Sequence, residues 1–206
     1  LPPAQLALFT DGDGISVINA FAGDAAELGF LGDVTAALPY RLLERSADRT
    51  DGRPRVLVLG AGAGYDVLLA LHNGAARIDA VERTVGVLRE RVIAEARGYV
   101  SRGAGTLDGD RYDLVQVALL DSAAVAGSGA QALSESYLYT VEAIGRYLQR
   151  LEPGGLLAVT RWIKIPPRDN LKLAATAIEA LRRAGVADPG RRLVMIRGWN
   201  TATLLV

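Results

Sequence analysis

Apolar and polar positions alternate along this chain with two different periods. Short apolar runs rich in β-branched residues predict buried strands, and apolar residues three or four positions apart predict helices. The pattern is clearest from residue 55 onward, where the two kinds of segment follow each other in turn. The expected strands are Val56–Leu59, Arg77–Val81, Val92–Ala94, Tyr112–Leu120, Leu156–Thr160, Leu193–Ile196 and Thr203–Val206. The expected helices are Asp66–Leu71, Ser134–Leu151 and Asn170–Ala184.

This repetition predicts an α/β fold, a Rossmann-like doubly wound sheet with right-handed crossovers. We assign the sheet to residues 55–206 and a small β-rich N-terminal appendage to residues 1–54. Within the appendage, "DGDG" (11–14) precedes an alternating run and predicts a hairpin turn. Residues 30–45 have helical spacing, which Pro39 is expected to break or kink.

The composition of the chain excludes several kinds of functional site and partner. The chain has 206 residues, 23 basic and 23 acidic, so its formal net charge is zero and we expect no nucleic-acid partner. It has no cysteine and one histidine, which excludes thiol chemistry and makes a metal site hard to build, so no metal is expected. No apolar run approaches the length of a transmembrane helix and no signal peptide is visible, so we expect a cytoplasmic location.

The stretch "RVLVLGAGAGYDVLLALHNGA" (55–75) carries the strongest functional signal. A strand that ends in Gly60, Gly62 and Gly64 and feeds a helix is a nucleotide-binding geometry. Glycine permits backbone torsions and a close approach that a Cβ would block. Glu82 follows at the end of the next expected strand, where a carboxylate can accept hydrogen bonds from both ribose hydroxyls.

The spacing also indicates the class of nucleotide. The dinucleotide fingerprint requires Gly or Ala where this chain has Tyr65, which is too large for that place. The GxGxG spacing instead favours S-adenosylmethionine or its relatives over NAD. The competing interpretation is a glycine-rich turn without any ligand.

Several segments resemble the spermidine synthase (polyamine aminopropyltransferase) group within the class I S-adenosylmethionine-dependent methyltransferase fold. They are "VLVLGAGAGYDVLLALHNGAARIDAVE", "VIAEARGYV", "DRYDLVQVALLD", "LSESYLYTVEAIGRYLQRLEPGGLLAVTRW" and the "DGDG" hairpin, and together they cover most of the chain. Helix, Pro-Gly-Gly turn and strand in "LEPGGLLAVT" form the most specific signature of that fold.

The resemblance implies a transferase that moves an aminopropyl group from decarboxylated S-adenosylmethionine, its co-substrate, to a small-molecule amine acceptor. By position, the glycine turn would flank the nucleoside and Glu82 would hold the ribose. Glu95 matches the acid after the third strand, whose neighbourhood binds adenine and the ligand's amino group. Asp121 matches the second acid of the family's Asp-x-x-Asp-Pro loop, which binds the acceptor, and is the expected catalytic residue.

The chain departs from the family pattern at three of these positions. The first Asp of the loop, which helps to deprotonate the amine, falls on Ala118, and the Pro falls on Ser122. The Asp inside the family's glycine turn falls on Ala63, although Asp66 stands one turn away and is a candidate cofactor-binding residue. Without a base at position 118, proton removal from the amine must fall to water or to Asp121.

Three hypotheses follow. The first is aminopropyl transfer; the second is methyl transfer from S-adenosylmethionine, which relies more on alignment and less on a base. The third is a nucleoside-binding domain without catalysis. The resemblance also allows a homodimer and fusion to a membrane segment outside this chain.

Overall fold

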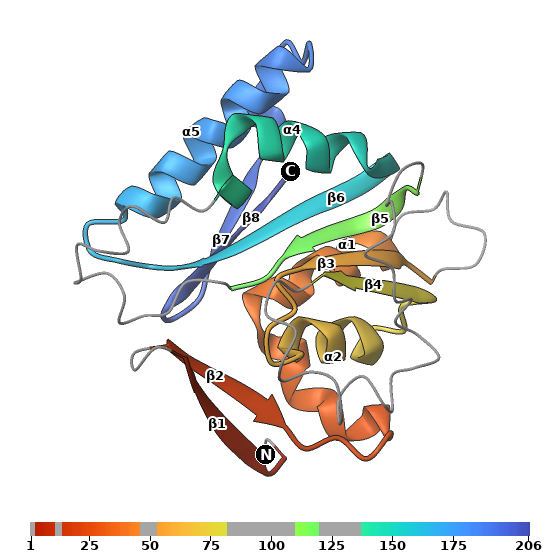
Figure 1. Cartoon of the computed structure of the whole chain (residues 1–206). Helices are drawn as coiled ribbons and strands as arrows, with labels where there is room; N and C mark the ends of the chain where they lie inside the picture. Colours follow the sequence, from red (N-terminus) through yellow and green to blue (C-terminus); the bar gives the residue numbers. More distant parts are fainter. Residues whose placement is uncertain (1–2, 11–13, 46–52, 82–109, 120–136) are drawn as a thin grey trace.

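A six-stranded mixed sheet in the order β4-β3-β5-β6-β8-β7 forms the centre of the computed structural model (Figure 1). The structure describes residues 3–10, 14–45, 53–81, 110–119 and 137–206. The strands are β3 (Arg55–Leu59), β4 (Arg77–Val81), β5 (Tyr112–Val117), β6 (Leu151–Trp162), β7 (Val194–Arg197) and β8 (Thr201–Leu205). The pairs β4–β3, β3–β5 and β5–β6 are parallel, whereas β8 runs antiparallel to β6 and β7.

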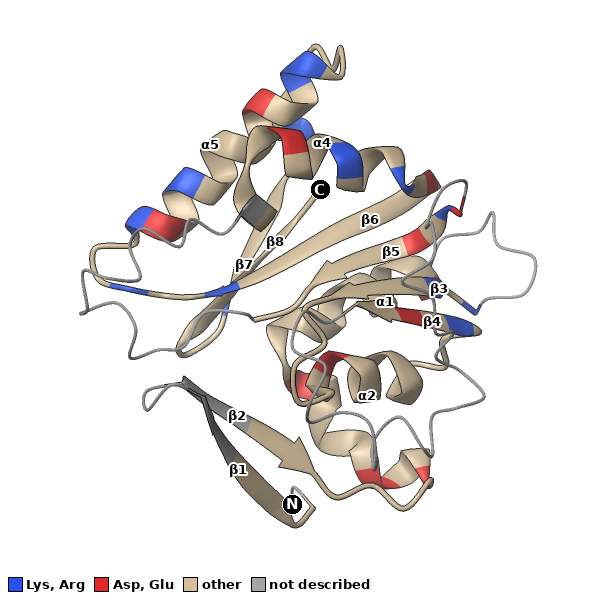
Figure 2. Cartoon of the chain, in the orientation of Figure 1, with Lys and Arg blue, Asp and Glu red and all other residues tan. Residues whose placement is uncertain are grey.

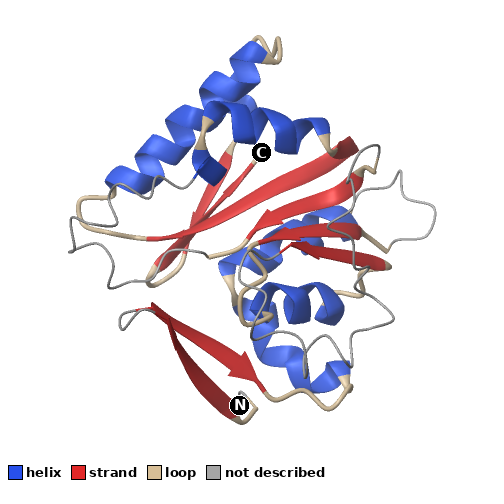
Figure 3. Cartoon of the chain, viewed as in Figure 1, coloured by secondary structure: helices blue, strands red, loops and turns tan. Residues whose placement is uncertain are grey.

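Helices cover both faces of the sheet, as the alternating pattern predicts (Figure 3). One face carries α1 (Leu38–Glu44) and α2 (Tyr65–His72), and the other carries α4 (Val141–Gln149) and α5 (Arg168–Arg183). In the part of the chain that the structure describes, no helix combines the length and the apolarity needed to cross a membrane.

The alternation of side chains in β3 explains its unbroken apolar run. Val56 and Val58 pack in the core beneath α1 and α2, while Leu57 and Leu59 pack in the core beneath α4 and α5. Successive residues of a strand point to opposite faces, so a strand buried on both faces needs apolar residues throughout.

The N-terminal residues form a separate two-stranded sheet and then join the main core. β1 (Gln5–Thr10) and β2 (Gly14–Asn19) pair antiparallel, with Thr10 opposite Gly14, which confirms the hairpin predicted from "DGDG". The 3₁₀ segments η1 (Ala25–Asp33) and η2 (Thr35–Ala37) follow. Leu28 and Leu31 of η1 are fully buried in the same core as β3 and α2. The division at residue 54 stays a prediction.

Two expected boundaries were wrong, each for a local reason, and a third expected element could not be compared. Pro39 does not break a helix but stands in the first turn of α1, where its missing N–H leaves no hydrogen bond unmade. The amphipathic helix expected from Ser134 begins as α4 after Thr140, whose side chain accepts a hydrogen bond from the Ala143 N–H at 3.1 Å. The expected strand Val92–Ala94 lies outside the described residues.

Strand β6 also begins earlier than expected, at Leu151, and contains the "EPGG" sequence that was expected to form a turn. The pairing register with β5 shifts at this point, and Gly154 has a φ of +77°. A Cβ on Gly155 would lie 2.9–3.1 Å from three backbone carbonyl oxygens, so only glycine fits this irregular part of the strand.

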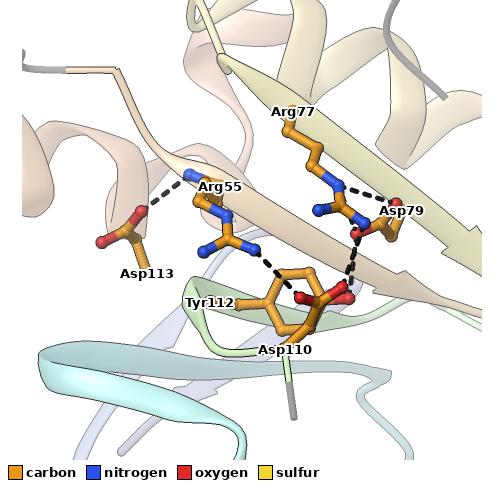
Figure 4. Close-up of polar contacts among 6 residues, drawn as sticks. All are labelled: Arg55, Arg77, Asp79, Asp110, Tyr112 and Asp113. Atoms are coloured by element: carbon orange, nitrogen blue, oxygen red, sulfur yellow. Dashed lines mark hydrogen bonds and ion pairs between the residues drawn. The ribbon is translucent and has the colours of Figure 1, made fainter. Parts of the chain in front are cut away.

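A polar network ties the amino ends of β3, β4 and β5 together (Figure 4). The Arg77 guanidinium lies 3.0 Å from the buried Asp79 carboxylate and 3.1 Å from Asp110. Tyr112 donates its hydroxyl hydrogen to Asp79 at 2.9 Å, and Arg55 forms an ion pair with Asp110 at 3.6 Å. This network stands at the edge of the sheet opposite to the glycine turn, and its carboxylates are matched by arginines.

We expect Gly155→Ala to lower the free energy of unfolding by about 1–3 kcal/mol, because backbone oxygens cannot move aside as a flexible side chain can. Gly145→Ala, inside α4, is the matched control. An added Cβ there meets no atom within 4 Å, so alanine should raise stability by about 0.5–1 kcal/mol through helix propensity. Urea unfolding of the two variants beside the parent protein measures both effects. Equal effects would contradict this account of Gly155.

Candidate nucleoside-binding site

The glycine turn connects the carboxyl end of β3 to the start of α2. Gly60, Gly62 and Gly64 have φ values of +78°, +49° and +88°. L-residues with a Cβ rarely adopt this left-handed region, so the backbone path itself requires glycine at alternating positions.

Backbone hydrogen bonds hold the turn against the neighbouring strand. The N–H groups of Gly60 and Ala61 donate to the carbonyl of Val81, the last residue of β4, at 2.8 and 3.3 Å. The Gly64 N–H donates to the Ala61 carbonyl at 2.7 Å and closes the turn. The carboxyl ends of β3 and β4 therefore meet directly at the glycine turn.

The turn also lies where the order of strands reverses. The chain leaves β3 through α2 to β4 on one side, and β5 pairs with β3 on the other side. The Ala118 N–H, just after β5, donates to the Leu59 carbonyl at 3.0 Å. In open α/β sheets, ligands bind outside the carboxyl ends of the strands at such a switch point.

The geometry around the turn suits a nucleoside. Among the described residues, a Cβ on Gly62 would have only the Gly60 carbonyl oxygen within 4 Å, at 3.8 Å. Gly64 is the N-cap of α2 and makes no side-chain cap, so the first N–H groups of the helix face the turn. These groups and the positive end of the helix dipole attract oxygen atoms of a ligand.

Comparison with solved structures places this geometry in a known fold. The chain is similar to a 16S rRNA N2 methyltransferase of T. thermophilus solved with AdoMet and guanosine, at 18% identity and a TM-score of 0.52, over 98% of this chain and 50% of that one. It is also similar to human methyltransferase-like protein 13 solved with SAH, at 17% identity and a TM-score of 0.50, over 85% and 80% of the two chains. The ribosomal protein L11 methylase of Lactobacillus delbrueckii subsp. bulgaricus matches at 14% identity and a TM-score of 0.50, over 82% and 75%.

The chain has the class I methyltransferase fold. This confirms the α/β fold predicted from the pattern and, of the resemblance, the class I methyltransferase fold. These likenesses lie at low identity and show the fold alone. No protein-family model matches the chain.

The chain is also similar in sequence to part of a DNA mismatch repair protein MutS of Sorangium cellulosum (strain So ce56). The identity is 34% over an alignment of 164 residues that covers 68% of this chain. The chain spans about 18% of the length of that relative. The likeness therefore concerns a segment of that protein and assigns no family to this chain.

Within the class I methyltransferase fold, the structure places some of the predicted site residues. Gly60, Gly62 and Gly64 form the turn and Asp66 stands in the first turn of α2. Glu82, Glu95 and Asp121 lie outside the described residues, and their roles stay predictions.

Asp66 points away from solvent into the core, with 7% of its surface exposed. Its carboxylate accepts a hydrogen bond from the side-chain amide of Gln116, which is fully buried on β5. The Gln116 carbonyl oxygen in turn accepts the hydroxyl hydrogen of Tyr40, on α1, at 2.7 Å. We call these three side chains the Tyr40–Gln116–Asp66 chain. It joins α1, β5 and α2 directly below the glycine turn.

Sequence reasoning missed Tyr40 and Gln116. The signal for Gln116 is present, because it is the one amide in the otherwise apolar end of "YDLVQV" (112–117), and a buried amide needs partners. Tyr40 has no such signal, since a tyrosine on an apolar helix face is equally typical of packing.

Burial dominates the titration of the groups around Asp66. It raises the pKa of the Asp66 carboxyl to about 6, and the hydrogen bond from Gln116 opposes this shift. Burial, together with the Asp66 charge, raises the pKa of Tyr65 to about 12 and that of Tyr40 well above its ordinary value. At neutral pH the carboxylate is therefore charged and both tyrosines are neutral.

The Asp66 shift predicts a pH-dependent stability. Between about pH 4 and pH 6 the folded protein retains a proton that the unfolded chain has released, so the free energy of unfolding falls as pH rises through this window. Relative to Asp66→Asn, the parent protein should lose about 2–3 kcal/mol from pH 4 to pH 7. Urea unfolding across this range measures the difference, with the exposed Asp33→Asn as control. Parallel profiles for the parent and Asp66→Asn would refute it.

Proposed function

We propose that the protein binds S-adenosylmethionine on the glycine turn and transfers its methyl group to an acceptor. The observation that carries this proposal is the turn itself. Three glycines with positive φ stand at the strand-order reversal, before the start of α2, in a class I methyltransferase fold.

One part of the donor site is formed by described residues. The other part is assigned from positions in the sequence. The turn gives close backbone approach, and the N-terminus of α2 gives hydrogen-bond donors and a favourable dipole. Glu82 directly follows Val81, which the turn contacts, so we assign it to the ribose hydroxyls. Glu95 is assigned to the adenine and the amino group of the ligand on the strength of the resemblance.

Ala118 favours methyl transfer over aminopropyl transfer. It stands at the carboxyl end of β5 with 3% of its surface exposed, where the aminopropyltransferase pattern has the Asp that helps to deprotonate an amine. Displacement at the sulfonium methyl depends chiefly on aligning the acceptor atom, the carbon and the sulfur, and a missing base costs such a reaction less.

Aminopropyl transfer from decarboxylated S-adenosylmethionine is the second candidate, and the resemblance of the quoted segments supports it. It would use the same glycine turn and would hold a small amine acceptor with Asp121. The two functions differ in the donor, because decarboxylated S-adenosylmethionine lacks the carboxylate that a methyltransferase accommodates.

Calorimetric titration with S-adenosylmethionine, decarboxylated S-adenosylmethionine and methylthioadenosine separates these functions. For a methyltransferase we expect S-adenosylmethionine to bind best, with a Kd on the order of 1 μM to 1 mM, the range usual for enzyme substrates. Preferential binding of the decarboxylated donor, with release of methylthioadenosine when a diamine is added, would establish the second candidate. Binding without turnover of either donor would indicate a nucleoside-binding domain without catalysis.

Two glycine variants show whether the turn is the site. Gly62→Ala imposes strain of about 1–3 kcal/mol on the turn and adds a Cβ where the ligand would approach the backbone, so the affinity for S-adenosylmethionine should fall about tenfold or more. Gly74→Ala imposes similar strain at the other end of α2, where φ is +69° and a Cβ meets nothing within 4 Å, and should leave the affinity unchanged. Equal affinities for the two variants would place the ligand elsewhere.

A further inference from the structure

Asp66 is a buried carboxylate that the donor site described above does not use. It lies on α2 only two residues from Gly64, the last glycine of the turn, so their Cα atoms are separated by at most about 7.6 Å. Its side chain turns inward to Gln116 and leaves the ligand side of the turn to the backbone. A group bound over the turn would therefore lie on the order of 10 Å from a negative charge beneath it.

The surroundings of that charge are neutral. Tyr40 faces it from α1, Gln116 from β5, and Tyr65 precedes it on α2, and none of these carries a charge at neutral pH. Helix α2 has neither Lys nor Arg, and His72 stands at its far end (Figure 2). On η1 and α1, Asp33 and Arg41 are more than half exposed and lie 3.8 Å from each other.

Keeping an ionised carboxylate in this position lowers stability, because burial disfavours the charged form and a single amide partner offsets only part of that cost. Among the described residues, no cation pairs with Asp66, in contrast to Asp79, which lies against Arg77 at 3.0 Å. A cation in the ligand site would supply the missing charge. Protein between the two groups screens their attraction less than water does.

We propose that Asp66, held by Gln116 and Tyr40, makes the site prefer a cationic sulfonium donor over the neutral thioether that remains after transfer. Asp66 acts here as a specificity-determining residue through its charge, without touching the ligand. The proposal rests on the proposed function. Transfer also removes the positive charge of the sulfonium. The attraction to Asp66 is then weaker, which favours release of the product.

The test compares S-adenosylmethionine with S-adenosylhomocysteine, which differ by the methyl group and one positive charge. Both dissociation constants are measured by calorimetry between pH 5 and pH 7.5. The ratio of the two cancels contributions that the ligands share. A Coulomb attraction at about 10 Å changes the preference about 4-fold to 17-fold between neutral and ionised Asp66 for an effective dielectric of roughly 20–40. Because part of Asp66 is already ionised at pH 5, we expect the preference for S-adenosylmethionine to rise about threefold to sevenfold across this range.

Two variants show whether the pH-dependent preference comes from the Asp66 charge. Asp66→Asn keeps the shape and can still accept the hydrogen bond from Gln116, and it should remove both the preference and its pH dependence. Asp79→Asn makes the same change to a buried carboxylate at the opposite edge of the sheet, and should keep both. If Asp66 had only a structural role, Asp66→Asn would weaken the binding of both ligands equally and leave the ratio of their dissociation constants unchanged.

The outcomes are distinguishable. If both ligands bind and the ratio is flat with pH, or Asp66→Asn retains the parent profile, this inference is wrong and the proposed function stands. If neither ligand binds the parent protein, the proposed function fails and the inference fails with it. The pH profile of the parent protein decides the matter even if Asp66→Asn does not fold.

Discussion

The Tyr40–Gln116–Asp66 chain is the polar constraint around which the ligand-facing half of this molecule is organised. It crosses a largely apolar core and connects a helix before the sheet, a central strand and the helix after the glycine turn. A buried amide has two directional groups, and here both are used, so the three elements have one mutual arrangement that satisfies them. The first turn of α2, and with it the glycine turn, is thereby fixed relative to β5.

Much of the fold could be predicted from the sequence because the strands are buried on both faces. The run Val56–Leu59 needs apolar residues at every position, and such runs separated by helical spacing leave few alternatives. The first and last residues of helices and strands were harder to predict, because each depends on one or two particular contacts. Thr140 begins α4 by accepting one backbone hydrogen bond, and Gly155 continues β6 through a sequence that is typical of turns.

The parts of the candidate site formed by consecutive residues could be predicted from the sequence. The contacts between residues far apart in the sequence could not. The glycines of the turn are recognisable in the sequence, because one short loop needs a positive φ at each of them. Asp66 was predicted as a candidate cofactor-binding residue, whereas its contact with Gln116, 50 residues further along the chain, and that of Gln116 with Tyr40, 76 residues before it, were not predicted. No spacing rule connects such positions, because the sheet alone brings them together.

The network at the amino ends of the strands has a consequence for how this fold tolerates change in length. Val81 is held by the backbone of the glycine turn, and Asp110 is held by Arg55 and Arg77, so both ends of the connection from β4 to β5 are anchored independently of what lies between them. The entropy of closing a loop grows only by about 0.6 kcal/mol for each doubling of its length. Insertions and deletions in this connection can therefore accumulate during evolution without shifting the register of the sheet.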